Sequence, residues 1–132
     1  MPAIDLKKLL ILINDEKDLQ ADLCLDLDCI MVTDEPQPFI RSVNYIINYL
    51  GSLSTATLHI GLSAQKDVFI ISFLIHPLDA PPGLLRKDAE ETLGGYGVKT
   101  AIDIKYPEYG KVLLTCPRQG TGQRPGNSQK GP

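Results

Sequence analysis

The chain has 132 residues, of which 43% are hydrophobic and 22% charged, and its formal net charge is −3 at pH 7. Its last fifteen residues hold three basic side chains and no acidic one, so residues 1–117 carry ten basic and sixteen acidic side chains, a balance that argues against a nucleic-acid-binding body. The longest apolar run, residues 68–75, is far shorter than the roughly 20 residues of a membrane span, and the N-terminus lacks the features of a signal peptide, so we expect a cytoplasmic protein with no membrane contact.

The first half of the chain predicts helix, strand and helix. Residues 4–13 form a short, strongly apolar segment that is typical of a helix. Residues 22–28 (DLCLDLD) alternate leucine with polar residues, which is the pattern of a strand with one buried face. Residues 34–50 predict the second helix, whose approach or first turn accommodates Pro36 and Pro38.

Two hairpins and a third helix are predicted in the second half. Residues 55–62 and 68–75 read as strands joined by a polar turn, and the second is apolar on both faces, so we expect it to lie centrally with cover on each side. A proline-rich loop at 76–83 precedes a short helix at 84–93. Residues 98–105 and 111–116 form the second predicted hairpin.

These elements predict an α+β fold. We expect a two-layer sandwich, in which a mixed or antiparallel sheet of about five strands carries three helices on one face. Residues 1–117 would form a single domain, and residues 118–132, which contain no large apolar side chain, a disordered polar tail.

The second helix carries two asparagines one turn apart, at Asn44 and Asn48. Asparagine is a mediocre helix former whose side chain competes for backbone hydrogen bonds, so this pair needs a reason. At 100° per residue both amides share a ridge with Arg41, beside the apolar stripe that faces the sheet. Such a ridge suits a magnesium ion and its phosphates. It also suits ordinary solvated polar side chains, which is the interpretation that the wheel geometry alone favours.

The context of these asparagines resembles the N-box helix of the GHKL superfamily, the ATP-binding domain of sensor histidine kinases and gyrase-type topoisomerases. Asp34 comes ten residues before the sequence NYIINYL, a predicted strand precedes the helix, and a hairpin follows it. The resemblance implies a Bergerat-like fold with ATP and magnesium as ligands. It also implies that Asn48 binds the metal and phosphates, with Asn44 in support.

Two glycine-containing loops resemble further motifs of that superfamily. Asp79 and Gly83 match the ends of D-x-G-x-G, with Pro81 in place of the middle glycine; the resemblance implies that Asp79 accepts a hydrogen bond from the adenine amino group and that Gly83 lets the loop turn. Gly95 and Gly97 would correspond to the G-x-G that cradles the triphosphate. The short segment between Gly83 and Gly94 leaves no room for the family's mobile lid, however, and the residues after Gly97 alternate like a strand, so we expect the lid and cradle to be eroded.

No catalytic residue is predicted. His59 lies in a strand pattern and His76 precedes a proline, so neither is a phosphoacceptor on a helix before the N-box. The topoisomerase branch needs a glutamate where this chain has Asn44. The three cysteines have no CxxC spacing and read as small hydrophobic residues.

Three hypotheses therefore stand. The first is a degenerate histidine-kinase-type ATPase module that acts as a regulatory domain by binding a signalling protein such as a kinase, a response regulator or an anti-sigma-type target. The second is a genuine ATP- and magnesium-binding domain that phosphorylates a partner in trans. The third is a small domain of unrelated α+β fold. We favour the first. Its cofactors would be ATP and magnesium, or none if the site is fully degenerate, and the sequence does not reveal its oligomeric state.

Overall fold

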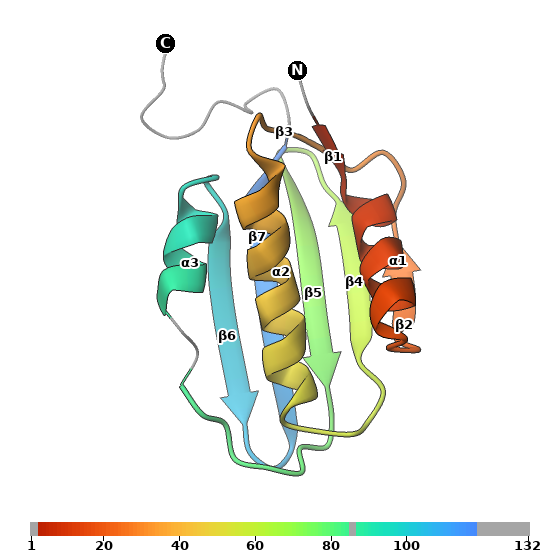
Figure 1. Cartoon of the computed structure of the whole chain (residues 1–132), viewed down its shortest axis with the longest axis vertical. Coiled ribbons are helices and arrows are strands. Elements are labelled where there is room, and N and C mark those ends of the chain that lie inside the picture. Colours follow the sequence, from red (N-terminus) through yellow and green to blue (C-terminus); the bar gives the residue numbers. More distant parts are fainter. Residues whose placement is uncertain (1–2, 85–86, 119–132) are drawn as a thin grey trace.

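The structure, a computed structural model, describes residues 3–84 and 87–118 (Figure 1). Its elements are β1 (Ala3–Asp5), α1 (Leu6–Lys17), β2 (Asp22–Leu25), β3 (Ile30–Val32), α2 (Pro36–Gly51), β4 (His59–Ala64), β5 (Val68–Ile75), α3 (Lys87–Gly94), β6 (Lys99–Lys105) and β7 (Tyr109–Pro117).

A mixed five-stranded sheet with the order β2-β4-β5-β7-β6 forms one layer, and α1, α2 and α3 lie together over one of its faces (Figure 1). β2 is parallel to β4, whereas the other neighbours are antiparallel. The two predicted hairpins are the β4–β5 and β6–β7 pairs, and β7 joins them by pairing with β5. The predicted α+β sandwich is confirmed.

The sequence patterns missed a small second sheet. β1 and β3 pair antiparallel, with Ile4 opposite Met31. The helix predicted from residue 4 therefore begins at Leu6, after Asp5, whose carboxylate accepts a hydrogen bond from the Lys8 amide at 3.2 Å. Strands of three residues are too short to show an alternating pattern.

Three other boundaries were wrong. The strand predicted for residues 22–28 ends at Leu25, and Leu27 beyond it is 67% exposed. The strand predicted for 55–62 covers His59–Ala64, because the residues before it form a loop. The third helix begins at Lys87 within the described residues, so residue 84 lies outside it. The predicted tail from residue 119 onward lies outside the described residues.

The helices and sheet enclose one hydrophobic core. Helix α2 supplies Phe39, Val43, Ile46, Ile47 and Leu50, all at most 1% exposed, as the helical periodicity predicts. Pro36 and Pro38 lie in the first turn of α2, where a missing backbone N–H costs little. No helix in the described ranges is long and apolar enough to cross a membrane.

The two faces of β5 differ, and this corrects one prediction. Phe69, Ile71 and Phe73 are buried under the helices, whereas the alternate residues of β5, which point to the other face, are only partly buried. β5 is central in the sheet, as expected, but all three helices lie on the same side of it (Figure 1). The expected cover on both faces is therefore wrong for the described part of the chain.

The three thiols differ in accessibility, which gives a direct check of the fold. Cys24 is exposed, whereas Cys29 and Cys116 are buried, and burial raises the pKa of both buried thiols. We expect a maleimide to label one thiol per native chain within minutes and all three after unfolding. Mass spectrometry of the labelled peptides should place the native label at Cys24, and rapid native labelling of Cys116 would contradict this packing.

Candidate functional site

The outer face of α2 holds the two predicted asparagines. The apolar side of the helix packs on the sheet, so its polar ridge points away from the core. Asn44 is half-buried and donates from its amide nitrogen to the Ile40 carbonyl at 3.2 Å, one turn back along the helix. Asn48 is exposed, and its amide oxygen accepts a hydrogen bond from the Lys17 ammonium group of α1 at 3.1 Å.

The contact with Lys17 bears on the predicted metal ligand. The amide oxygen is the atom of Asn48 that would bind magnesium, and here an ammonium group donates to it. In the described part of the chain no group of three or more histidine, cysteine or acidic residues is placed to hold a metal ion. This contact leaves no local signal in the sequence, since 31 residues separate the two partners.

Tyr49 connects α2 to the predicted adenine loop. Its hydroxyl donates to the Gly83 carbonyl at 2.9 Å, so the side chain spans the space between the end of the helix and this loop. Burial raises the Tyr49 pKa, and the neighbouring Tyr45 raises it further. The Tyr49 side chain therefore fills space between α2 and the loop that a small side chain such as alanine would leave empty.

Asp79 also forms hydrogen bonds within the protein. Its carboxylate accepts hydrogen bonds from the Thr55 amide at 2.8 Å and the Thr55 hydroxyl at 3.2 Å, and its own amide donates to the Leu53 carbonyl at 2.7 Å. These contacts hold the loop after β5 against the segment that follows α2.

This contact changes what we expect of Asp79→Ala. The resemblance by itself implies that Asp79→Ala abolishes any nucleotide affinity and leaves folding nearly intact, whereas the contact with Thr55 adds a stabilising role. Two hydrogen bonds at an exposed carboxylate predict a loss of about 1 kcal/mol in the free energy of unfolding. Urea unfolding should show this loss and little change for Asp67→Ala, an exposed aspartate in the β4–β5 turn; equal stability of the two variants would contradict the role.

Gly95 and Gly97 lie at the wrong end of a helix for a phosphate cradle. The Gly95 amide donates to the Glu91 carbonyl and the Gly97 amide to that of Gly94, so both close the C-terminus of α3. Gly97 adopts a positive φ of 77°, which favours glycine. Anions bind at helix N-termini, where amides are free, while the C-terminus carries partial negative charge.

The glycine turn is also far from the Asp79 loop. Between its two glycines, Tyr96 stacks edge-on against Phe39 at 5.7 Å between ring centroids and donates to the Glu35 carbonyl, which places the turn beside the start of α2. The Asp79 loop lies beside the end of α2. At about 1.5 Å per residue the two ends of this helix are roughly 20 Å apart, so these predicted residues do not meet in one pocket.

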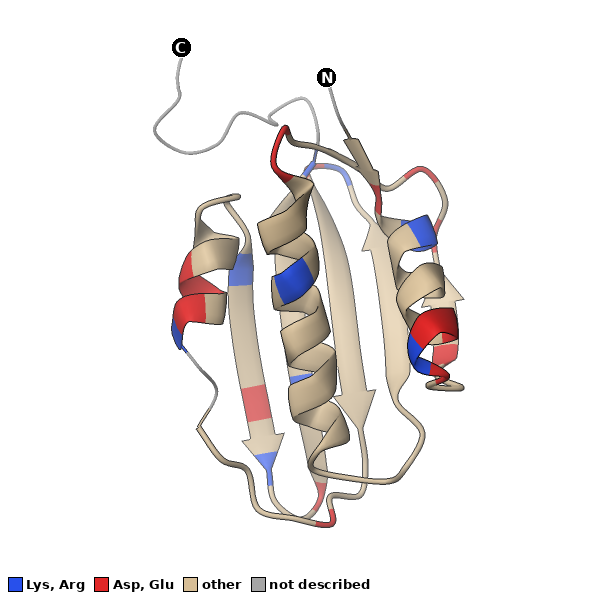
Figure 2. Cartoon of the chain, viewed as in Figure 1, with Lys and Arg blue, Asp and Glu red and all other residues tan. Residues whose placement is uncertain are grey.

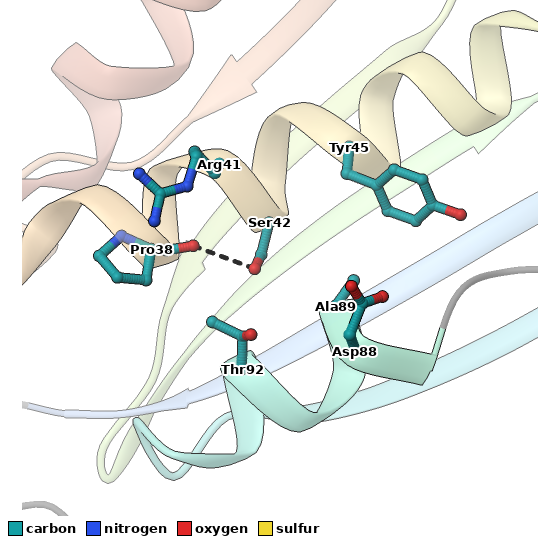
Figure 3. A pocket seen from close by; sticks show the side chains of 7 residues that line it. All are labelled: Pro38, Arg41, Ser42, Tyr45, Asp88, Ala89 and Thr92. Atoms are coloured by element: carbon teal, nitrogen blue, oxygen red, sulfur yellow. Dashed lines mark hydrogen bonds between the residues drawn. The ribbon is translucent and has the colours of Figure 1, made fainter.

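A shallow groove lies between α2 and α3 (Figure 3). Its volume is about 280 Å³, and its walls are Pro38, Arg41, Ser42 and Tyr45 from α2 and Asp88, Ala89 and Thr92 from α3. Ser42 donates to the Pro38 carbonyl at 3.0 Å, so its hydroxyl is used within the helix. The sequence did not predict this groove, because it depends on how two distant helices pack.

The contacts of Asn48, Tyr49 and Asp79 do not fit a bound magnesium nucleotide as they stand. The Asn48 amide oxygen and one Asp79 carboxylate oxygen each have a partner within the protein, and the glycine turn lies elsewhere. Nucleotide binding by the six residues named from the sequence (Asn44, Asn48, Asp79, Gly83, Gly95 and Gly97) stays a prediction.

The two histidines are surface residues. The His59 Nδ1 lies 3.0 Å from an Asp22 carboxylate oxygen, and the imidazole rings of His59 and His76 stack with 5.6 Å between their centroids.

The fold is that of histidine kinase ATPase domains. The chain superimposes on the mycobacterial sensor histidine kinase MprB with a TM-score of 0.71 and 9% identity, covering 89% of this chain and 97% of that one. For the Acinetobacter baumannii histidine kinase AdeS the TM-score is 0.66 at 9% identity, covering 89% and 67%. For the ATP binding domain of PrrB from Mycobacterium tuberculosis it is 0.64 at 12% identity, covering 89% and 96%.

Comparisons of sequence add nothing to this likeness, since no protein-family model and no curated protein matches the chain. The similarity to the kinase domains is thus one of fold. The resemblance predicted from the asparagine helix and its neighbours is confirmed at this level, and the hypothesis of an unrelated α+β fold is wrong.

Proposed function

We propose that this chain, which has the histidine kinase ATPase fold, is a degenerate module of that type that regulates signalling by binding a protein partner through the outer face of α2. The proposal rests on one observation: residues predicted to bind nucleotide form hydrogen bonds within the protein instead. The amide oxygen of Asn48 is bonded to Lys17, the carboxylate of Asp79 to Thr55, and Tyr49 bridges to Gly83.

The composition of this face supports a protein contact. Helix α2 contains one charged residue, Arg41, whereas acidic residues gather on α3 and on the last turns of α1 on either side of it (Figure 2). A centre poor in charge with a charged rim is typical of protein interfaces, and tyrosine and arginine are enriched among the residues that dominate binding. Tyr45 and Tyr49 lie on successive turns, with 6.5 Å between ring centroids.

The groove beside this face suits one side chain of a partner better than a cofactor. Its volume of about 280 Å³ lies at the lower end of the range of roughly 300–1,000 Å³ for small-molecule pockets, which is small for a nucleotide. Arg41 and Tyr45 form its outer wall (Figure 3). A partner in two-component signalling, such as a kinase or a response regulator, would place an acidic or polar side chain beside Arg41.

Photo-crosslinking in the cells that produce the protein tests this proposal. Benzoylphenylalanine at position 45 keeps an aromatic ring in place and should give one discrete adduct, which Arg41→Glu should abolish. The matched control is the same probe at Lys66, an exposed position in the β4–β5 turn. Identical adducts from both positions, or an adduct that persists in Arg41→Glu, would contradict a docking site on α2.

A second measurement separates this function from its alternative, an ATP- and magnesium-binding domain that phosphorylates a partner in trans. A ligand that binds only the folded state raises stability, by about 2.7 kcal/mol at a hundredfold excess over its Kd. We expect magnesium ATP at 10 mM to leave the thermal midpoint unchanged. A rise of several degrees would favour the alternative.

A further inference from the structure

The two histidines of the chain meet on the sheet face opposite the helices. His59 is the first residue of β4, and His76 directly follows β5, the antiparallel neighbour of β4. Each is next to a buried residue, Ile60 or Ile75, that faces the helices, so both imidazoles lie on the other side of the sheet (Figure 1). Their rings stack with 5.6 Å between centroids and 10° between planes.

The register of the hairpin brings these rings within reach of one ion. His59 lies opposite Leu74, so His76 is its diagonal neighbour on the same face. Diagonal neighbours in an antiparallel pair are close enough for aromatic side chains to meet. Two nitrogens that bind one metal ion at 2.0–2.1 Å lie about 3 Å from each other. His76 is exposed, so its ring can rotate to reach this separation without disturbing the core.

Asp22 orients the His59 ring for metal binding. The two residues are directly opposite in the parallel β2–β4 pair, and an Asp22 carboxylate oxygen lies 3.0 Å from His59 Nδ1. An ionised carboxylate only accepts hydrogen bonds, so Nδ1 carries the proton and the neutral imidazole keeps its lone pair on Nε2. Metal-binding histidines typically donate their other ring N–H to a carboxylate in this way, which fixes the tautomer and raises the basicity of the ligand.

The ligand set suits an exchangeable transition-metal ion. Imidazole nitrogens bind Zn²⁺, Cu²⁺ and Ni²⁺, whereas magnesium and calcium prefer oxygen ligands. Within the described residues no group of three or more histidine, cysteine or acidic side chains is placed to hold a metal ion. Two imidazoles therefore supply the protein ligands, and water molecules complete the coordination.

We propose that His59 and His76 form a surface site for a divalent transition-metal ion such as Zn²⁺. His59 Nε2 and one ring nitrogen of His76 bind the ion, and Asp22 is a positioning residue. The ion links the start of β4 to the end of β5 and so closes the open end of this hairpin. The site lies on the sheet face opposite α2, so the proposal does not rest on the proposed function, and either can fail alone.

Calorimetric titration of the tag-free chain with zinc chloride tests the site. We expect one Zn²⁺ per chain and an affinity at least tenfold weaker in His76→Ala, which alters an exposed residue. Asp22→Ala should weaken binding by about tenfold or more. The matched control Asp103→Ala removes an exposed aspartate at the other edge of the same face, where it accepts a hydrogen bond from Tyr109, and should leave the affinity unchanged. Equal losses in the two aspartate variants would contradict the role of Asp22.

Nuclear magnetic resonance of the imidazole nitrogens locates the ion. Without metal, neutral His59 should carry its proton on Nδ1, and Asp22→Ala should shift it towards the Nε2–H tautomer. Zn²⁺ should shift His59 Nε2 and one nitrogen of His76. Cys24→Ser, which removes the exposed thiol of β2, should bind as the wild type does. No binding at 1 mM Zn²⁺, an unchanged affinity in His76→Ala, or binding that is lost in Cys24→Ser would overturn the proposal.

Discussion

Phe39→Ala should lower the free energy of unfolding by about 3–5 kcal/mol, which is the cost of removing a large buried aromatic side chain. Phe39 is fully buried, and its ring packs edge-on against Tyr96. The substitution leaves a cavity at the start of α2 and removes the aromatic contact that holds α3 beside that helix. Because small domains are stable by only about 5–15 kcal/mol, this variant should unfold at much lower urea concentration.

Equilibrium urea unfolding followed by circular dichroism measures this effect. The control Leu12→Ala removes side-chain atoms from a position that is 52% exposed and should cost less than about 0.5 kcal/mol. A loss below about 1 kcal/mol for Phe39→Ala would contradict the packing of α2 and α3, because cavities of this kind are far more costly.

The stability of the protein should fall above pH 9 through Cys116. Burial, with a smaller contribution from the neighbouring Cys29, raises the pKa of this thiol from 9.0 to about 12. The folded state therefore keeps the proton while the unfolded thiol ionises, so the stabilisation is fully present below pH 9 and is lost as the pH rises towards 12. The loss from this residue is about 1.4 kcal/mol for each pH unit.

Comparison of wild type with Cys116→Val isolates this effect. Tyrosines and lysines also ionise above pH 10, but their contributions are common to both proteins. The difference in unfolding free energy between the two proteins should thus shift by about 1 kcal/mol between pH 9 and pH 10 and hardly at all between pH 7 and pH 8. Parallel pH profiles would mean that Cys116 ionises in the folded state as it does in the unfolded chain.

Patterns within single elements predicted most of the fold. The apolar periodicity of residues 39–50 predicted the buried face of α2, and the two hairpins follow from strands separated by short polar turns. The end of β2 could not be predicted, because it depends on contacts with a distant strand: β4 continues to Ala64, whose amide donates to the Asp26 carboxylate at 2.8 Å. Asp28, which follows, adopts a positive φ of 60°. The alternation of leucine and polar residues continues past Leu25, although the pairing of β2 with β4 ends there.

The candidate site was predicted only in part. The sequence showed that Asn44 and Asn48 share an exposed ridge and that Asp79 lies in a loop after the second hairpin strand. The partners of these residues come from distant segments: Lys17 from α1, Thr55 from the loop after α2. Such contacts leave no local signal, and the groove between α2 and α3 is hidden for the same reason.

The glycine motif shows how a local pattern can mislead. Gly95-Tyr96-Gly97 resembles a phosphate-binding turn in composition, yet the turn follows α3 and its amides are already bonded to the carbonyls of that helix. A short glycine motif does not reveal whether it precedes or follows a helix. That information comes from the pattern of the flanking residues, and the strand after Gly97 was such a sign.

A calorimetric titration with magnesium ATP and a non-hydrolysable analogue decides whether the chain still binds nucleotide. We expect no saturable heat up to millimolar nucleotide, because Asn48, Tyr49 and Asp79 form hydrogen bonds within the protein. Binding with a Kd below 1 mM that weakens when Asn48 is replaced by alanine and when magnesium is omitted would contradict it. In that case the asparagine pair serves a nucleotide, and the chain is an ATP-binding domain in function as well as in fold.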